Sequence, residues 1–338
     1  MNILVIGGTI FLGRHFVQAV LNAGHQLTLF HRGKSNPNLF PEAEHILGDR
    51  RLTEDLKKLE GRSWDALFDP SGYFPRDVET LLDVVGLNVN HYTFISSIGV
   101  YPHGKEGSNE NSPVEELTSQ MSRDKITPEN YGPLKAAAEA KGEEMLSGKT
   151  LNIRPGLIAG PHDPSDRFTY WPWRVLQGGR VLAPGIPEQS VQVIDGRDLA
   201  GWILRLVETG TTGLFNGTGP AQPMPMNRFL GTCKESLGSD AEFLWASEEF
   251  LAEHKVSAYT EMPLWIPSES NGMNQADISR ALEAGLTFRP IEETIRETME
   301  WFKTTDRFED GLRAGISRDR ERELLGELSL KGESIEKE

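Results

Sequence analysis

The chain has 338 residues, 38% of them hydrophobic and 25% charged, a composition typical of a globular chain with about two domains. Its 35 basic and 50 acidic residues give a formal net charge of −15, which disfavours nucleic acid or an anionic membrane as the main partner. The single cysteine, Cys233, excludes an internal disulfide, and no Cys/His group has zinc-site spacing, so no metal is expected. No apolar run reaches the ~18 residues of a membrane helix, and no leader is recognisable, so we expect a cytoplasmic protein.

Short apolar runs alternate with helical stretches along the first half of the chain. Strands are predicted at residues 2–6, 26–30, 44–47, 66–69, 91–97 and from 151. The first strand is followed by a helix, because apolar residues recur on one helical face at Leu12, Phe16, Val17, Val20 and Leu21. This alternation predicts a Rossmann-type α/β fold, a doubly wound parallel sheet with helices on both faces.

The pattern changes after Pro161, where residues 161–190 are rich in Pro, Gly, Arg and aromatic residues. A strand at 191–194, a helix at 196–208 and a strand at 213–219 indicate a return to the sheet layer. Further helical patterns lie at 226–237, 247–254 and 291–302. We therefore predict a Rossmann domain over 1–165 with a return at about 191–219, a smaller interleaved substrate-binding domain over 166–303, and a charged tail over 304–338 that forms a solvated or partly ordered helix.

A glycine-rich turn, GGTIFLG, joins the first predicted strand to the first helix. Glycines permit a tight turn and let backbone N–H groups approach a pyrophosphate at the positive end of the helix. A P-loop is excluded, because the GxxxxG spacing of Gly8 and Gly13 is followed by Arg14 and His15 instead of Lys and Ser or Thr. Dinucleotide binding is therefore predicted for Gly7, Gly8, Thr9, Phe11, Leu12 and Gly13.

The second predicted strand ends at His31 and Arg32, with no carboxylate that would bind the ribose hydroxyls of NAD. Arg32 would instead meet the 2′-phosphate of NADP, and the alternative is a solvated arginine on a turn. The choice between NAD and NADP therefore stays open, with Arg32 favouring NADP. Asp49 and Arg50, after the third strand, are placed to reach the adenine end.

Tyr131 and Lys135 are four residues apart and share one face of a helix. Pro133 is tolerated only in a first helical turn, so the helix is predicted to begin near Asn130, with Tyr131 at its positive end. This end and the Lys135 ammonium are expected to lower the pKa of Tyr131 towards a useful acid–base range. Ser97 ends the fifth strand, where it would hydrogen-bond the reacting oxygen. The ordered combination of glycine turn, Ser97, Tyr131 and Lys135 is far more specific than Tyr-x-x-x-Lys alone and predicts a catalytic set.

Three segments, GGTIFLG, FISSIGVYP and YGPLK, resemble the glycine turn, serine-bearing strand and Tyr/Lys helix of the extended short-chain dehydrogenase/reductase family, the nucleoside-diphosphate-sugar epimerases and dehydratases. RPGLIAGP resembles the segment whose backbone lines the nicotinamide, and VQVIDGRDLA more weakly resembles the return to the sheet. The resemblance covers about residues 1–302. It implies a Rossmann domain and a smaller substrate domain with catalysis in the cleft between them. It gives catalytic roles to Ser97, Tyr131 and Lys135, and cofactor contacts to Pro70, Ser71, Tyr131, Lys135 and Pro155.

The chain departs from this family in three places. Ile10 replaces the middle glycine, so its side chain would crowd the pyrophosphate unless the turn is reshaped. The small-residue segment after the fourth strand is DPSG, at 69–72. Ile98 and Gly99 stand where sugar 4,6-dehydratases carry an acidic pair, which argues against a dehydratase mechanism.

The GGTxFLGR turn, with a basic residue after the second strand, resembles an atypical bacterial epimerase-like subgroup. Chloroplast stem-loop RNA-binding proteins are similar in this region, but RNA binding is hard to transfer to a chain with a net charge of −15. The aromatic stretch at 166–174 is the candidate substrate wall. Arg167 and Tyr170 are predicted to contact the substrate together with Ser97, whereas the tryptophans are predicted to be core. Arg197 and Asp198 are either an internal ion pair or a substrate clamp.

Together these patterns predict an NAD(P)-dependent epimerase-type oxidoreductase that transiently oxidises a hydroxyl carbon of a sugar, with a nucleotide sugar as the favoured substrate. One alternative is an NADPH-dependent carbonyl reductase that releases its cofactor. Another is a non-catalytic dinucleotide- or RNA-binding protein on the same fold. The expected partner is a small-molecule substrate, with no nucleic acid or membrane, and the family resemblance suggests a homodimer.

Overall fold

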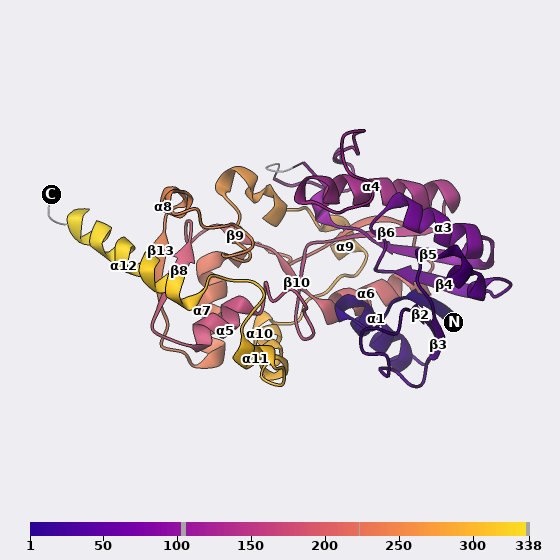
Figure 1. The fold of residues 1–338 in the computed structure, drawn as a ribbon, viewed down its shortest axis with the longest axis horizontal. Helices are drawn as coiled ribbons and strands as arrows, with labels where there is room; N and C mark the ends of the chain where they lie inside the picture. Colours follow the sequence, from indigo (N-terminus) through magenta and orange to yellow (C-terminus); the bar gives the residue numbers. More distant parts are fainter. Residues whose placement is uncertain (103–105, 223, 336–338) are drawn as a thin grey trace.

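The computed structural model describes residues 1–102, 106–222 and 224–335, which form two lobes (Figure 1). The first lobe holds a seven-stranded sheet in the order β11-β6-β5-β4-β1-β2-β3, and every neighbouring pair is parallel. Its strands are β1 (Asn2–Ile6), β2 (Gln26–His31), β3 (Glu44–Leu47), β4 (Trp64–Asp69), β5 (Val89–Ile95), β6 (Thr150–Pro155) and β11 (Gly213–Gly217). The predicted Rossmann-type fold is confirmed. The strand order reverses between β1 and β4, where such sheets open their ligand crevice.

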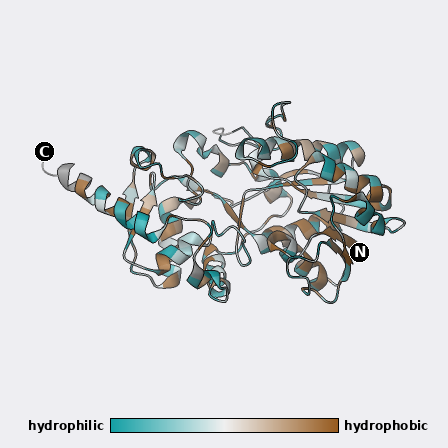
Figure 2. Ribbon diagram, viewed as in Figure 1, coloured by the Kyte–Doolittle hydropathy of each residue, from teal (hydrophilic) through white to brown (hydrophobic). Residues whose placement is uncertain are grey.

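Two helical layers cover this sheet. Ile3 and Val5 share a core with α1 (Phe11–Asn22) and α6 (Gly196–Glu208). Leu4 and Ile6 point to the other face, with α3 (Pro75–Val85) and α4 (Pro128–Met145). Because both faces are covered, the strands are apolar on both sides, and Figure 2 shows the hydrophobic colours concentrated on these strands.

The second lobe has its own apolar core. Its members come from α5 (Tyr170–Leu176), β8 (Arg180–Pro184), α7 (Met226–Leu237), β13 (Glu242–Ala246), α8 (Glu248–Glu253), α10 (Ile291–Phe302) and α12 (Arg318–Ile335). Strands β8 and β13 form a parallel pair. Trp171 is fully buried in this core, and its indole N–H donates to the Pro263 carbonyl at 2.6 Å, as expected for a core tryptophan.

The chain crosses between the lobes several times. Strand β7 (Leu157–Ala159) pairs with β10 (Val193–Asp195), and β9 (Ser190–Val191) pairs with β12 (Met224–Pro225). The predicted return of 191–194 to the main sheet is therefore wrong, because these residues belong to two small two-stranded sheets and the edge beside β6 is taken by β11. Helix α9 (Ser279–Glu283) returns once more, and its Ala281 joins the core of the first lobe.

The charged segment after residue 304 is not merely solvated. It contains α11 (Arg307–Asp310) and α12, and Leu324 and Leu325 of α12 are buried in the second core. Glu321 is also buried and forms an ion pair with Arg174 at 2.7 Å. One face of α12 is thus part of the lobe, and charged residues occupy the outer face.

Short helices complete the described chain: α2 (Thr53–Leu56), η1 (Lys57–Leu59), η2 (Gly86–Asn88), η3 (Ile98–Val100) and η4 (Ser268–Asn274). Within the described ranges, no helix is long and apolar enough to cross a bilayer.

Candidate active site

A cavity of 1310 Å³ opens at the carboxyl ends of the main strands and extends to the second lobe. Ligand pockets commonly have volumes of about 300–1,000 Å³, so this cavity has room for a dinucleotide and a second molecule. Every residue predicted for the site lines it, with the exception of Tyr170.

The glycine turn between β1 and α1 forms one end of the cavity. Gly7 and Gly8 have φ values of 99° and 88°, a region that only glycine adopts readily. A Cβ on Gly13 would lie 3.1 Å from the Gly8 Cα, so the helix packs directly on the turn. No side chain caps the start of α1, which leaves its first backbone N–H groups free to bind an anion.

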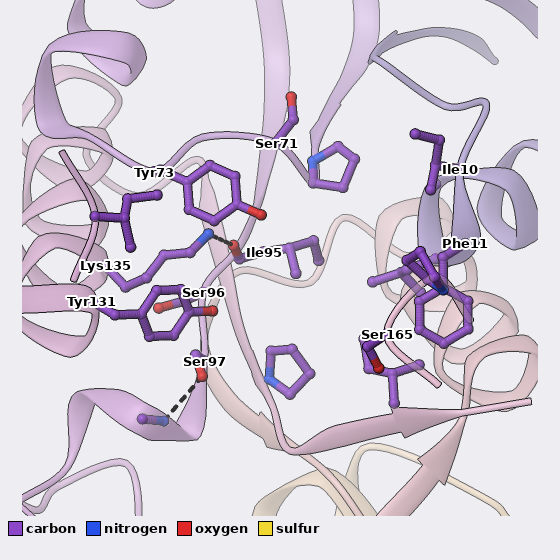
Figure 3. Close-up of a pocket in the computed structure, with 18 of the residues that line it drawn as sticks. Ile10, Phe11, Ser71, Tyr73, Ile95, Ser96, Ser97, Tyr131, Lys135 and Ser165 are labelled. Carbon is purple, nitrogen blue, oxygen red and sulfur yellow. Dashed lines mark hydrogen bonds between the residues drawn. The ribbon is translucent and has the colours of Figure 1, made fainter. Parts of the chain in front are cut away.

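Ile10 does not fill this turn. Its backbone is extended and its side chain is 48% exposed on the cavity rim. Thr9 fixes the local geometry, because its hydroxyl donates to the Ser35 carbonyl at 2.8 Å and its own carbonyl accepts from the Asn36 amide at 2.9 Å. Figure 3 shows Ile10 and Phe11 across the cavity from Tyr131.

Basic side chains surround the end of the cavity beyond β2 and β3. Arg32, Lys34 and Arg51 line the cavity and are exposed. Their charged groups make no hydrogen bond or ion pair with any residue that the structure describes. Arg32 thus has no charged partner among the described residues, and its contact with a 2′-phosphate stays a prediction. Asp49 also lines the cavity, and its carboxylate accepts from the Arg51 backbone N–H at 3.0 Å.

Arg50 lines the cavity and is bound within the protein. Its guanidinium donates to the Asp69 carboxylate at 2.8 Å and to the Ser71 hydroxyl at 3.0 Å. Burial alone would raise the pKa of Asp69, but the charge and hydrogen bonds of Arg50 outweigh it and hold that pKa below its ordinary value. Arg50 thus holds Asp69 and Ser71 in place while it lines the cavity, and its contact with the adenine end stays a prediction.

The catalytic candidates lie on adjacent elements. Ser97 precedes η3, and its hydroxyl accepts from the Gly99 N–H at 3.0 Å. Tyr131 lies in the first turns of α4, and its side chain lines the same cavity as Ser97. The Lys135 ammonium donates to the carbonyls of Gly72 and Ile95 at 2.7 and 2.8 Å. Figure 3 shows the three side chains on one wall of the cavity.

Helix α4 begins earlier than predicted. It starts at Pro128, and Thr127 and Asn130 form a capping box at its N-terminus. Asn130 therefore caps from within the helix instead of preceding it, and Pro133 lies inside the helix. The expected start near Asn130 is wrong, because proline at the first position and the capping box together define an earlier beginning.

The predicted lowering of the Tyr131 pKa is also wrong for the protein alone. Burial raises the pKa of Tyr131 to about 12, although the nearby Ser97 hydroxyl and the Arg167 charge oppose the shift. Burial also lowers the pKa of Lys135 to about 8, against the opposing charge of Asp69. At neutral pH Tyr131 therefore holds its proton. The Lys135 amine titrates near the pH range in which an enzyme commonly works.

Arg167 and Tyr170 have different surroundings. Arg167 lines the cavity, with its guanidinium carbon 4.6 Å from the centre of the Tyr259 ring. Tyr170 is 1% exposed and packs in the second core beside Trp171 and Gly315. Its predicted substrate contact is wrong, because α5 turns this ring inward.

Arg197 and Asp198 also lie outside the cavity lining. Arg197 pairs with Asp195 at 2.6 Å, and Asp198 pairs with Arg289 at 2.9 Å. Each of the two residues therefore belongs to an internal ion pair, but they do not pair with each other.

The lining also contains residues that were not predicted, among them Tyr73, Asp163 and Tyr259. The Tyr73 ring lies 4.6 Å from the Lys135 ammonium. Tyr73 and Asp163 directly follow segments already matched to the site, so position alone could have identified them. Tyr259 carries no such signal, because it reaches the cavity from a distant segment of the second lobe.

No protein-family model matches the chain. A chloroplast stem-loop binding protein of 41 kDa (form b) from Arabidopsis thaliana is 27% identical over 242 residues, which cover 64% of this chain and 58% of that protein. The match thus spans little more than half of that relative. A putative dihydroflavonol 4-reductase from a Synechocystis strain is 22% identical, with 88% of this chain and 94% of that protein covered.

Solved structures with the same fold cover nearly the whole chain. UDP-glucose 4-epimerase from Thermotoga maritima, solved with UDP-glucose, has a TM-score of 0.63 at 20% identity and covers 90% of this chain and 99% of its own. dTDP-glucose 4,6-dehydratase from Bacillus anthracis, solved with NAD, has a TM-score of 0.64 at 16% identity and covers 91% and 98%. At these identities the likeness shows the fold.

Proposed function

We propose that the protein is an NAD(P)-dependent oxidoreductase of the epimerase type that acts on a hydroxyl carbon of a sugar. One observation carries this proposal: Ser97, Tyr131 and Lys135 share one wall of a cavity whose other end is an uncapped glycine turn. A binding module would not need an acid–base tyrosine beside a buried lysine. The structural neighbours support the same reaction class, because they include UDP-sugar epimerases.

The residues at the turn fit a dinucleotide. Gly7, Gly8 and the first N–H groups of α1 would hold its pyrophosphate, and the exposed side chain of Ile10 leaves this space open. Pro70, Ser71 and Pro155 line the cavity towards Lys135 and would contact the nicotinamide half. When bound, the nicotinamide would accept a hydride from the substrate carbon and return it.

Residues of the chain would carry out the proton transfer. Tyr131 would exchange a proton with the substrate oxygen at its hydroxyl, and Ser97 would orient that oxygen by a hydrogen bond. Lys135 is held by two backbone carbonyls, so its ammonium is fixed beside the tyrosine and would also bind the nicotinamide ribose. We assign substrate binding to the segment 166–303, with Arg167 as a contact, and a nucleotide sugar is the class that several neighbours bind.

A second candidate is a carbonyl reductase that uses and releases NADPH. Two observations favour it. Tyr131 is protonated at neutral pH, as a proton donor to a carbonyl must be. Arg32, Lys34 and Arg51 offer positive charge at the end of the cavity where the 2′-phosphate of NADP would lie.

The first test is to denature the purified protein and identify any released nucleotide by chromatography. Bound NAD or NADP supports a cofactor that is recycled, as in an epimerase. A protein that carries none but binds NADPH in a titration supports the reductase. Binding of neither nucleotide would contradict both, and tight RNA binding at physiological salt would then favour the function named for the Arabidopsis relative.

A further inference from the structure

The basic side chains of the cavity are unevenly distributed. Among the described residues that line it, the cofactor half contains Arg32, Lys34, Arg50, Arg51 and Lys135. In the substrate half, formed by residues 115, 126–128, 163–167 and 258–274, Arg167 is the one basic residue in the described lining. Among the described lining residues of this half, Arg167 is therefore the side chain that offers a positive charge to the substrate.

Arg167 is free to bind such a charge. Its guanidinium makes no hydrogen bond or ion pair with a described residue, although other arginines of the same lobe are paired, such as Arg174 with Glu321. The guanidinium lies over the Tyr259 ring at 4.6 Å. A guanidinium that stacks on a ring keeps its N–H groups available at the edge, where a planar carboxylate can accept two hydrogen bonds.

Tyr259 is held in an unusual conformation that maintains this stack. Its φ is 61°, a region that bulky residues rarely adopt. Its backbone N–H donates to the carbonyls of Met262 and Trp265, both at 3.1 Å. The segment thus fixes the ring in place, which keeps the guanidinium of Arg167 in the cavity.

Two acidic residues, Glu115 and Asp163, line the same half. Asp163 is 1% exposed, and one of its oxygens accepts from the Ser165 N–H and hydroxyl at 2.8 and 2.7 Å. Its other oxygen is buried without a hydrogen-bond partner in the structure. Burial raises the pKa of Asp163 to about 6, so at neutral pH it still carries negative charge. A half of the cavity with one free cation and two acids suits a monoanion better than a diphosphate, which brings at least two charges.

We infer that the substrate is a sugar acid, whose single carboxylate binds Arg167 close to the reacting carbon, and that it is not a nucleoside diphosphate sugar. The inference rests on the proposed function and narrows its substrate class. Arg167 and Tyr131 line the same cavity, so a substrate that fills it can reach both side chains. A carboxylate attached at or near the oxidised carbon would let the substrate bind Arg167 and present its reacting oxygen to Tyr131 at the same time.

The test is calorimetric binding to the full chain saturated with NADP⁺. The probes are glucuronate, galacturonate and gluconate, each with one carboxylate, then glucose, glucose 1-phosphate and UDP-glucose. At least one sugar acid is expected to bind about 10- to 100-fold more tightly than glucose, and more tightly than either phosphate compound. Arg167→Met should abolish this preference, and Arg167→Lys should retain part of it. Arg228→Met, on α7 outside the cavity lining, should leave it unchanged.

Two results would overturn the inference: tighter binding of UDP-glucose or glucose 1-phosphate, or equal binding of the acids and glucose. Nucleotide binding is measured in the same samples. A wild-type protein that binds NADP⁺ but shows no preference for sugar acids contradicts this inference alone. A wild-type protein that binds neither NAD⁺ nor NADP⁺ contradicts the proposed function itself. Unfolding curves of each variant show whether a lost preference reflects lost structure.

Discussion

Gly132 packs directly on the carbonyl oxygen of Gly99, so that a Cβ at position 132 would lie 2.1 Å from that oxygen. This contact seats the start of α4 on the turn that follows β5. Tyr131 and Ser97 lie close to these two glycines in sequence, so the approach of the backbones places both side chains on the same wall of the cavity. The glycine in YGPLK therefore has a positional role that is separate from the chemistry of its neighbours.

We predict that Gly132→Ala destabilises the protein by more than about 2 kcal/mol, because the backbone oxygen cannot yield as a flexible side chain would. The matched control is Gly231→Ala in α7, where an added Cβ meets nothing within 4 Å. That change should stabilise by up to about 1 kcal/mol through helix propensity. Urea unfolding of both variants measures the difference, and similar effects at the two sites would contradict the packing argument.

Tyr131→Phe should lower turnover by about 10²–10⁴-fold, because it removes the group that exchanges the proton. Affinity for the nucleotide should change little, since the pyrophosphate end of the cavity is untouched. Conversion of UDP-glucose or glucuronate to its epimer, followed by chromatography, gives the rate, because an epimerase causes no net reduction of NADP⁺. Fluorescence titration with NADPH gives the affinity. Near-normal turnover in this variant would exclude Tyr131 as the acid–base group.

Arg32→Ser should weaken NADPH binding by about tenfold or more and leave NADH binding nearly unchanged, because only NADPH carries the 2′-phosphate. Arg62→Ser is the control. Arg62 is also on the surface of the first lobe but pairs with Glu44 outside the cavity lining. Parallel titrations with both reduced nucleotides test the prediction, and an equal loss for NADH would show that Arg32 does not meet the 2′-phosphate.

Asp163 and Asp166 should have opposite effects on stability. Burial raises the folded pKa of Asp163 to about 6, so its favourable contribution is present at low pH and is lost as the pH rises through that value. Asp163→Asn should therefore stabilise the fold by about 1–3 kcal/mol at pH 8, and by less at pH 5. Asp166→Asn should destabilise it, because this buried carboxylate pairs with Arg307 and accepts from the Arg313 N–H. Urea unfolding at the two pH values measures both, and no gain for Asp163→Asn would mean that its burial is not costly.

The rate should also fall on the alkaline side. Burial lowers the pKa of Lys135 to about 8, so the ammonium is present below that pH and lost as the pH rises through it. If the charge supports Tyr131, kcat/KM should decline with an apparent pKa near this value. Lys135→Arg should shift the decline upward, because arginine keeps its charge. A profile that stays flat to pH 10 would show that the charge is not required.

The strands of the first lobe were predictable because their apolar runs are short and bounded by turn residues. The run at 2–6 and the structure's β1 have the same limits. The strand β8 was missed, since Arg180–Pro184 lies in a segment of glycine, proline and arginine with no alternation to mark it. The burial of α12 was missed for a related reason, because Leu324 and Leu325 are isolated among charged residues.

The site was predictable where chemistry and spacing coincide, as for Ser97, Tyr131 and Lys135. It was not predictable where a side chain can turn either way. Tyr170 was expected to contact the substrate, but its ring is buried in the second core. The pKa of Tyr131 depends on how deeply α4 is buried, and no local pattern encodes that depth.

The order in which the chain crosses between the lobes limits how it can be divided or made. A fragment that ends near residue 165 lacks β11, which pairs with the β6 edge, and α6, which packs on α1. Such a fragment would expose an open strand edge and an apolar face, both of which promote aggregation. During synthesis on the ribosome, strands β1–β6 therefore cannot complete the sheet until β11 has emerged from the exit tunnel. This requires at least residue 217 to be outside the ribosome.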